Sequence, residues 1–238
     1  MILPLSLSLM MLTLSMAPQN KGPSVTIAMA QVYCISGDRE GNLVRIENAI
    51  SDAKAGGAEI VVFPETMLFG WVNPVAHERA YPIPGKDSDL LSEMARKHDL
   101  FVCIGLSEKE GNQLYDTAVL IDSDGQILLK HRKRNILTEL MSPPYSQGKT
   151  VKVANTPWGK VGLLICADSF DQQILDEMSE LSPDLMLIPY GWAAPEDAWP
   201  EHGKELVKTV RRAAKELGCP VIGPNSVGMI TSGPWRDI

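Results

Sequence analysis

Hydrophobic residues from position 24 onward fall into two recurring patterns. Short continuous apolar runs are typical of buried strands, and they occupy residues 24–32, 58–63, 100–106, 160–166, 184–190 and 219–226. Segments with apolar residues three or four positions apart are typical of helices, and they occupy residues 42–57, 90–95, 171–181 and 206–217. Ser88 is placed to cap the second of these helices.

A hairpin interrupts this alternation of strands and helices. Within residues 114–132, two apolar segments flank Asp124 and Gly125, a dipeptide typical of tight turns. Strands that alternate with helices, together with one hairpin, predict an α/β layered domain with a mixed sheet. No repeat or linker divides the chain, so residues 23–238 are predicted to form one domain.

Composition and charge narrow the range of partners and cofactors. The 238 residues carry a formal net charge of −7, which argues against nucleic acid as a partner despite the basic run at 130–134. The four cysteines are widely spaced, which favours reduced thiols over a disulfide framework. The four histidines never fall at metal-ligand spacing, so we expect neither a metal site nor a cofactor.

The first 22 residues form an extension whose origin has two interpretations. Residues 1–17 have the apolar stretch and small-residue exit of a signal peptide, but no positive residue precedes the apolar part. Met16 opens a polar stretch that suits the start of a cytosolic protein. A mis-assigned start and a cytoplasmic location are favoured, and export is the alternative if residues 1–17 are a true signal.

Two predicted strands end at charged residues that could take part in catalysis. Glu65 follows Pro64 at a strand end, where open α/β sheets place functional groups. At the end of the hairpin, alternation puts Lys133 on the face of Leu129 and opposite Arg132. Lone acids after strands and short basic runs more often belong to solvated turns, so each residue is a weak candidate by itself.

Cys166 ends a third strand. Most cysteines in apolar strands are core residues, and Cys103 and Cys219 fit that interpretation because apolar residues continue beyond them. Cys166 differs because the apolar run stops there and Ala167 follows, a small residue whose backbone N–H can begin an oxyanion hole. An acid, a cation and a thiol can together attack a carbonyl or nitrile carbon.

The segments FPE, HRK and ICAD, which contain Glu65, Lys133 and Cys166, resemble in this order the Glu-Lys-Cys triad of the nitrilase superfamily of carbon–nitrogen hydrolases. The similarity covers about residues 25–228 and includes GGAEIVVFPE, YDTAVLIDSDGQIL, DLMLIPYGW and GPNSVG. It implies an α-β-β-α sandwich that assembles as a homodimer or a higher homo-oligomer.

The resemblance also implies a role for each catalytic residue. Glu65 would be the general base, Lys133 the cation that stabilises the tetrahedral intermediate, and Cys166 the nucleophile that forms a thioester. The Ala167 N–H would hold the oxyanion together with Lys133. Glu139 matches a second glutamate that positions substrate and lysine in this family.

The remaining substrate-binding predictions concern aromatic residues. Tyr190 and Trp192 are predicted to line the substrate pocket, and Trp71 and Tyr145 are plausible additions. Their positions depend on loops that the sequence alone does not place.

Two features depart from the family pattern. Ala-Asp follows the nucleophile, instead of the Trp-Glu of typical nitrilases, which counts against nitrile hydrolysis. Related enzymes continue with a G-x-S strand and a final hairpin after the position where this sequence stops, so the last family strands are expected to be missing.

The predicted activity is hydrolysis of a small non-peptide amide or N-carbamoyl compound through a cysteine thioester. A nitrilase and an N-acyltransferase are the alternatives within the family. The alternative from another class is a non-catalytic, truncated member that serves as a binding or oligomerisation module. The complete Glu, Lys, Cys and Glu set argues against this last alternative, and the missing strands argue for it.

Overall fold

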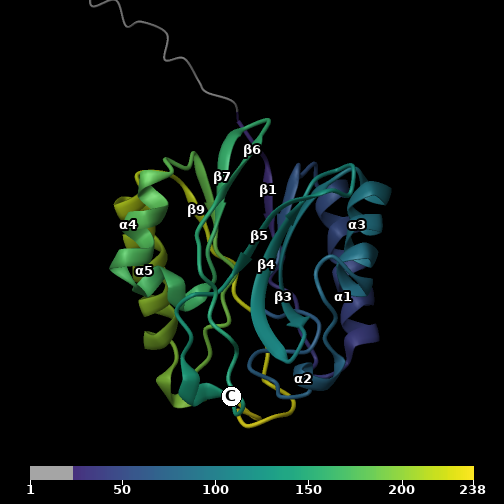
Figure 1. Cartoon of the computed structure of the whole chain (residues 1–238), viewed down its shortest axis with the longest axis vertical. Helices are drawn as coiled ribbons and strands as arrows, with labels where there is room; N and C mark the ends of the chain where they lie inside the picture. The colour runs from purple at the N-terminus through teal and green to yellow at the C-terminus, as the bar shows by residue number, and fades with distance from the viewer. Residues whose placement is uncertain (1–23) are drawn as a thin grey trace, which may run out of the picture.

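The computed structural model describes residues 24–238, so the predictions for residues 1–22 lie outside the described residues. Two β-sheets pack face to face, and each is covered on its outer side by helices (Figure 1). The layers follow the order helix, sheet, sheet, helix. The α-β-β-α sandwich implied by the sequence is thus confirmed.

The first sheet has the strand order β1-β2-β3-β4-β5. It is mixed, because β1 to β3 are parallel whereas β3 to β5 are antiparallel. Helices α1 and α3 cover its outer face (Figure 1). The elements of this half are β1 (Ile27–Met29), α1 (Arg39–Ala55), β2 (Ile60–Val62), α2 (Ala76–Arg79), α3 (Lys86–His98), β3 (Phe101–Glu110), β4 (Gln113–Ile121) and β5 (Ile127–Arg132).

The second sheet has the strand order β6-β7-β8-β9, with α4 and α5 on its outer face (Figure 1). β6 is absent from the sequence-based prediction, because its residues VANT contain no continuous apolar run. The elements of this half are η1 (Thr138–Leu140), β6 (Val153–Thr156), β7 (Gly159–Leu163), η2 (Cys166–Phe170), α4 (Gln172–Glu180), β8 (Leu185–Leu187), η3 (Glu196–Ala198), α5 (Glu201–Leu217) and β9 (Val221–Ile222).

Helix α3 begins earlier than its apolar periodicity predicts. The helix starts at Lys86 with Gly85 as its N-cap, so the prediction that Ser88 caps it was wrong. The Ser88 hydroxyl lies in the first turn, where it accepts a hydrogen bond from the Gly85 N–H and donates one to the Gly85 carbonyl, both at 2.9 Å. Its side chain therefore still stabilises the start of the helix.

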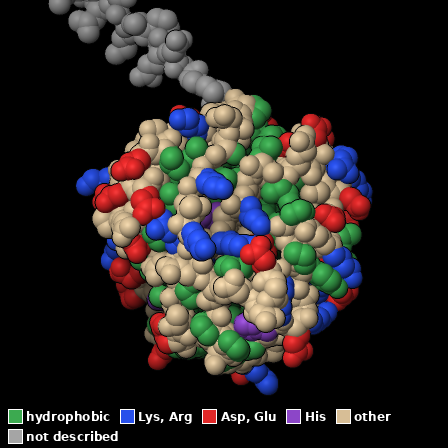
Figure 2. Space-filling view, viewed as in Figure 1, with side chains coloured by type: hydrophobic (Ala, Val, Ile, Leu, Met, Phe, Trp, Pro, Cys, Tyr) green, Lys and Arg blue, Asp and Glu red, His purple; other side chains and the backbone are tan. Residues whose placement is uncertain are grey.

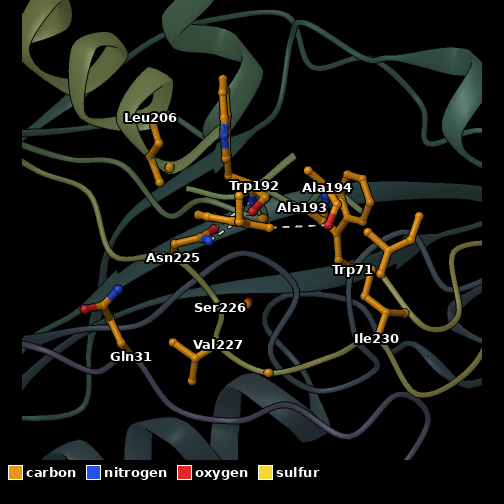
Figure 3. Close-up of a pocket in the computed structure, with 15 residues that line it drawn as sticks. Gln31, Trp71, Trp192, Ala193, Ala194, Leu206, Asn225, Ser226, Val227 and Ile230 are labelled. Atoms are coloured by element: carbon orange, nitrogen blue, oxygen red, sulfur yellow. Dashed lines mark hydrogen bonds between the residues drawn. The ribbon is translucent and has the colours of Figure 1, made fainter. Parts of the chain in front are cut away.

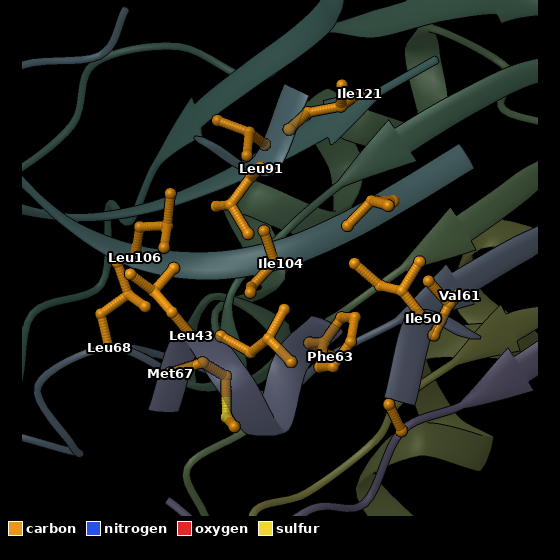
Figure 4. Close-up of a cluster of buried hydrophobic side chains, with 14 of the residues drawn as sticks. Leu43, Ile50, Val61, Phe63, Met67, Leu68, Leu91, Ile104, Leu106 and Ile121 are labelled. Carbon is orange, nitrogen blue, oxygen red and sulfur yellow. The ribbon is translucent and has the colours of Figure 1, made fainter. Parts of the chain in front are cut away.

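Buried apolar side chains form two layers. One lies between the first sheet and its helices, where Ile50, Phe63 and Ile104 are fully buried (Figure 4). The other contains the side chains of the opposite face, such as Cys103 and Leu120, and continues into the second sheet. Because successive strand residues point to opposite faces, each strand of the first sheet contributes to both layers.

The same alternation separates the cations of β5 and the residues that follow it. Leu129, His131 and Lys133 are buried, as the alternation predicts. Lys130 and Arg132 point to the other face, where each lies 2.7 Å from Glu108. Figure 2 shows Lys and Arg side chains gathered in the middle of the face over β5. Within the basic run 130–134, His131 and Lys133 are thus directed inward, whereas Lys130 and Arg132 point to the opposite face.

Among residues 24–238, no helix has both the length and the apolar character that crossing a bilayer would require.

Candidate active site

Glu65, Lys133 and Cys166 come together at one end of the layer between the two sheets. The Nζ atom of Lys133 lies 2.5 Å from Oε1 of Glu65. The charges of both residues act on the thiol of Cys166. Their residue exposures are 1%, 7% and 5%, so all three groups are shielded from bulk water.

The position of Glu65 is fixed by backbone contacts. The chain leaves β2 through Pro64, whose carbonyl accepts a hydrogen bond from the Gly105 N–H at 3.1 Å. A Cβ at position 105 would lie only 2.6 Å from the Glu65 Cα, so the two backbones can approach this closely only with glycine there. The Glu65 N–H donates to the carbonyl of Tyr190, which connects the acid to the second sheet.

Lys133 is held by both its backbone and its side chain. Its N–H donates to the Asp116 carbonyl at 2.8 Å, and its Nζ lies 3.4 Å from Oδ2 of Asp116. Burial alone would lower the pKa of Lys133, but the charges of Glu65 and Asp116 outweigh it and hold this pKa well above its usual value. Lys133 is therefore a fixed cation at neutral pH.

Cys166 lies at the start of η2, directly beyond the apolar run that continues β7. Its φ angle is 41°, in the left-handed region that a non-glycine residue seldom adopts. Such a conformation costs about 1–3 kcal/mol, and it persists where surrounding contacts enforce it. Here the Cys166 N–H donates to the Pro189 carbonyl at 3.0 Å, and the Ser169 hydroxyl donates to the Cys166 carbonyl at 2.7 Å.

The thiol of Cys166 is neutral at rest. Burial and the Glu65 charge raise its pKa, and these effects exceed the lowering by Lys133 and by the N–H of Gly191. A base must therefore remove the proton as the thiol attacks. Oε2 of Glu65 is buried and has no hydrogen-bond partner among the described residues, so it is available as the acceptor.

A backbone N–H donor lies next to the thiol. The first hydrogen bond of η2 runs from the Asp168 N–H to the Ile165 carbonyl, so the Ala167 N–H precedes the bonded turn. The Ala167 carbonyl accepts a hydrogen bond from the Asn135 side chain at 2.8 Å. The Cys166 carbonyl shares its peptide plane with the Ala167 N–H, and the hydrogen bond that it accepts from the Ser169 hydroxyl fixes this plane, which suits the Ala167 N–H to hold an oxyanion.

Asp168 joins the loop of Lys133 to the turn of Cys166. This buried carboxylate accepts hydrogen bonds from the His131 ring and from three backbone N–H groups, those of Arg134, Asn135 and Ile165. Burial alone would raise the pKa of Asp168, but the hydrogen bond and charge of His131, with further donors, hold it below its usual value. Asp168 is thus ionised, and it links the loop that follows Lys133 to the turn that contains Cys166.

A cavity of about 520 Å³ reaches the site at Gly191. A Cβ on Gly191 would lie 2.6 Å from Oε2 of Glu65, and the Gly191 N–H lowers the pKa of the Cys166 thiol. No lining side chain in the described part of the chain is acidic, basic or histidine. Figure 3 labels the larger lining side chains Gln31, Trp71, Trp192, Leu206, Asn225, Val227 and Ile230. Trp199 and Ile238 also line the cavity.

The predicted pocket residues divide into two groups. Trp192 lines the cavity, and its backbone N–H donates to Oδ1 of Asn225 at 2.7 Å (Figure 3). Trp71 also lines it. Tyr190 is fully buried outside the lining, with its hydroxyl 2.9 Å from that of Ser169, and Tyr145 is likewise buried. Tyr190 thus supports the turn of Cys166 instead of facing the cavity.

Glu139 does not join the other predicted residues. It lies in η1 with an exposed side chain, because the chain leaves the sheet after Lys133 and runs along the surface. The acids that contact Lys133 are Glu65 and Asp116. Sequence reasoning missed Asp116, although alternation along the apolar run 114–121 puts it on the buried face of Ala118.

Within residues 24–238, no group of three or more His, Cys, Asp or Glu residues is arranged to hold a metal ion.

Comparison with known proteins identifies the family. The model of the carbon-nitrogen hydrolase family matches residues 26–235, so the chain belongs to this family. An amidase from Nesterenkonia sp. AN1, solved with acrylamide added to its active-site cysteine, superposes with a TM-score of 0.75 at 22% identity. The match covers 87% of this chain and 80% of the amidase. Nit3 of Saccharomyces cerevisiae superposes with a TM-score of 0.77 at 21% identity, over 89% and 79% of the two chains.

Curated relatives include both nitrilases and an amidase. The bifunctional nitrilase/nitrile hydratase NIT4A of Nicotiana tabacum is 28% identical over 230 residues, which is 88% of this chain and 63% of the relative. The omega-amidase NIT2 of Danio rerio is 31% identical over 176 residues, which is 68% of this chain and 62% of the relative. The chain therefore spans less than two thirds of the length of these relatives.

Proposed function

We propose that this chain hydrolyses the carbon–nitrogen bond of small uncharged amides through a thioester on Cys166. The main support is that the two carboxylate oxygens of Glu65 have different surroundings. Oε1 is paired with Lys133, whereas Oε2 has no hydrogen-bond partner among the described residues and lies beside Gly191, whose N–H lowers the pKa of the Cys166 thiol. One acid can thus keep its ion pair while it accepts a proton from the nucleophile.

The first half of the reaction forms the thioester. Oε2 of Glu65 takes the thiol proton as Sγ of Cys166 bonds to the amide carbon. Lys133 and the Ala167 N–H stabilise the resulting oxyanion. Glu65 then returns the proton to the amide nitrogen, the carbon–nitrogen bond breaks, and ammonia or an amine leaves. The acyl group stays on Cys166.

The second half releases the acid. A water molecule gives a proton to Glu65 and its oxygen adds to the thioester carbon, with the oxyanion held by the same donors. The carbon–sulfur bond then breaks, and the departing sulfur takes the proton back from Glu65. The sum is one amide and one water consumed, one carboxylic acid and one ammonia or amine formed, and the thiol regenerated.

The lining of the cavity supports an uncharged substrate. A carboxylate that enters this cavity would lose hydration without gaining a cationic partner among the lining side chains. The tryptophans at positions 71, 192 and 199 instead offer apolar area for an aliphatic or aromatic acyl group. We therefore favour neutral amides over N-carbamoyl compounds that carry a free carboxylate.

Two further expectations from the sequence stay predictions. Homo-oligomer formation can be tested by light scattering of the purified chain. The cytoplasmic location can be tested by fractionating cells that express the full-length sequence.

The activity is tested by measuring ammonia release from a panel of compounds. The panel contains neutral aliphatic and aromatic amides, the nitriles with the same acyl skeletons, and N-carbamoyl amino acids. We expect turnover of the neutral amides, slower turnover of the nitriles and the least with the N-carbamoyl amino acids. Added hydroxylamine would reveal acyl transfer as hydroxamate formation. Absence of ammonia release from every amide would contradict the proposal.

A further inference from the structure

Lys133 has a second acidic neighbour that the proposed reaction does not use. Asp116 is carried by β4, and it shares a face of that strand with Ala118 and Leu120, which pack in the layer between the sheets. The strand therefore brings a carboxyl group into the interior, where Asp116 has an exposure of 2%.

Asp116 contacts Lys133 through both its backbone and its side chain. Its backbone carbonyl holds the Lys133 N–H at 2.8 Å, and its Oδ2 lies 3.4 Å from Lys133 Nζ. Its Oδ1 is buried without a hydrogen-bond partner among the described residues, as is Oε2 of Glu65. Two carboxyl groups thus meet a single ammonium group, and each has one free oxygen.

The charges of Glu65, Asp116 and Lys133 balance only if one of the two carboxyl groups carries a proton. With both ionised, Lys133 would leave one uncompensated negative charge in a buried site, and the oxyanion would add a second. Two carboxyl groups that share a buried site titrate so that one of them holds its proton to higher pH. Glu65 forms the shorter contact with Lys133, at 2.5 Å against 3.4 Å, so the proton falls to Asp116.

The other titratable groups that face Asp116 do not supply the missing positive charge. They are Glu65 beyond β2, Cys166 in η2, and Tyr145 in the loop after η1. Burial raises the pKa of both Cys166 and Tyr145, so these two are neutral near pH 7. Burial and the nearby Glu65 also raise the pKa of Asp116, against the opposite effect of Lys133.

We propose that Asp116 is a positioning residue that stays protonated in the working site, donates a hydrogen bond to Glu65 and accepts one from Lys133. This inference rests on the proposed amide hydrolysis. It assigns to a residue of β4 the lysine-orienting role that the family resemblance implies for Glu139. A protonated Asp116 leaves the resting set of Glu65, Lys133 and Cys166 neutral overall, so Lys133 can compensate the oxyanion.

The proposal predicts how two variants of one residue differ. Asp116→Asn keeps a donor and an acceptor in the same shape, so kcat near pH 7 should stay within about threefold of the wild-type value. Asp116→Ala removes both, and kcat should fall about 10²-fold with little change in KM, because a misplaced cation mainly weakens transition-state binding. Asp52→Asn, an exposed acid on α1, serves as the control.

The pH profile gives a readout that a purely structural role would not affect. When wild-type Asp116 loses its proton at high pH, the added negative charge opposes the oxyanion, so kcat should fall there. Asp116→Asn cannot lose that proton, and its alkaline limb should move to higher pH. Equal losses in the Asn and Ala variants, or an unchanged alkaline limb in the Asn variant, would overturn the proposal.

A spectroscopic measurement separates this inference from the activity itself. The infrared difference spectrum of wild type minus Asp116→Asn should contain the C=O band of a protonated buried carboxyl group near neutral pH. Thermal unfolding of each variant shows whether it is folded. If no amide is turned over and the band is present, the proposed function fails while the protonation of Asp116 stands. If amides are turned over and the band is absent, the inference about Asp116 fails while the proposed function stands.

Discussion

Cys103 and Cys166 are two buried thiols in the same apolar layer, and they have opposite surroundings. Cys103 lies within β3, paired with Val62 and Leu120, and burial is the cause that raises the pKa of its thiol. Cys166 lies beyond a strand end, where charges from Glu65 and Lys133 and the N–H of Gly191 also act on its thiol.

Burial alone therefore does not distinguish the core thiol of Cys103 from the proposed nucleophile. Regular pairing surrounds Cys103 with backbone that is already hydrogen bonded and with apolar side chains. The strand end at Cys166 releases the backbone into a positive φ angle, so its thiol meets groups carried by the other sheet. The difference in reactivity should therefore arise from neighbours, and each neighbour can be removed.

The largest effect should come from replacing the cysteines by alanine, one at a time. Cys166→Ala removes the nucleophile, so turnover of a neutral amide should fall by about 10⁴-fold or more. Cys103→Ala should keep kcat and lower the free energy of unfolding by about 1 kcal/mol through a small cavity. Ammonia release and denaturant unfolding measure the two quantities. Substantial turnover by the Cys166 variant would place the nucleophile elsewhere.

Removal of the base should have the next largest effect. Glu65→Gln keeps the shape of the side chain but cannot accept the thiol proton, so kcat should fall by about 10²–10⁴-fold. Glu59→Gln, an exposed acid before the same strand, is the matched control and should leave kcat unchanged. If the two variants have equal kcat values, general-base catalysis by Glu65 is wrong.

Crowding the base without removing it tests the geometry at Gly191. Gly191→Ala would place a methyl group 2.6 Å from Oε2 of Glu65 and even closer to the ring of Trp71, so it would displace the base, the ring or both. A displacement of this kind can cost about 10²-fold in kcat. Gly56→Ala, at the end of α1, meets its nearest atoms at an ordinary 3.4 Å and should leave activity unchanged. A fully active Gly191→Ala enzyme would show that activity does not depend on the close approach of Gly191 to Glu65 and Trp71.

The smallest effect concerns the charge of the substrate. Hexanamide and the monoamide of adipic acid have the same chain length, but the second carries a carboxylate. The cavity offers that carboxylate no cationic side chain, so kcat/KM should favour hexanamide by about tenfold or more. The preference should narrow at acid pH, where the carboxylate is protonated. Preference for the charged amide would require a cation that faces the bound substrate.

Local patterns in the sequence predict much of the fold and the buried position of Lys133. Apolar runs located most strands, and alternation from Leu129 placed Lys133 on the buried face. The family resemblance supplied the pairing of two sheets, which periodicity cannot reveal because the contacts between the sheets are distant in sequence. The short β6 was missed because pairing with β7, not hydrophobicity, keeps it in the sheet.

The supporting residues of the site were harder to predict, because their roles depend on contacts across the two sheets. Asp168 was visible as part of ICAD, but its partners come from the loop of Lys133. Gly105 and Gly191 matter only because backbone or side-chain atoms of Glu65 approach them. Glu139 matched by spacing along the chain, whereas Lys133 meets its second acid across the ladder between β4 and β5.

The central claim is that Cys166 forms the thioester, and trapping the acylated enzyme tests it most directly. The full-length chain is mixed with a slowly hydrolysed neutral amide, quenched in acid during turnover, digested and analysed by mass spectrometry. The account predicts the acyl mass on the peptide that contains Cys166, its absence from the peptide that contains Cys103, and its disappearance as turnover ends. An acyl group on another residue, or turnover without any acylated cysteine, would contradict it.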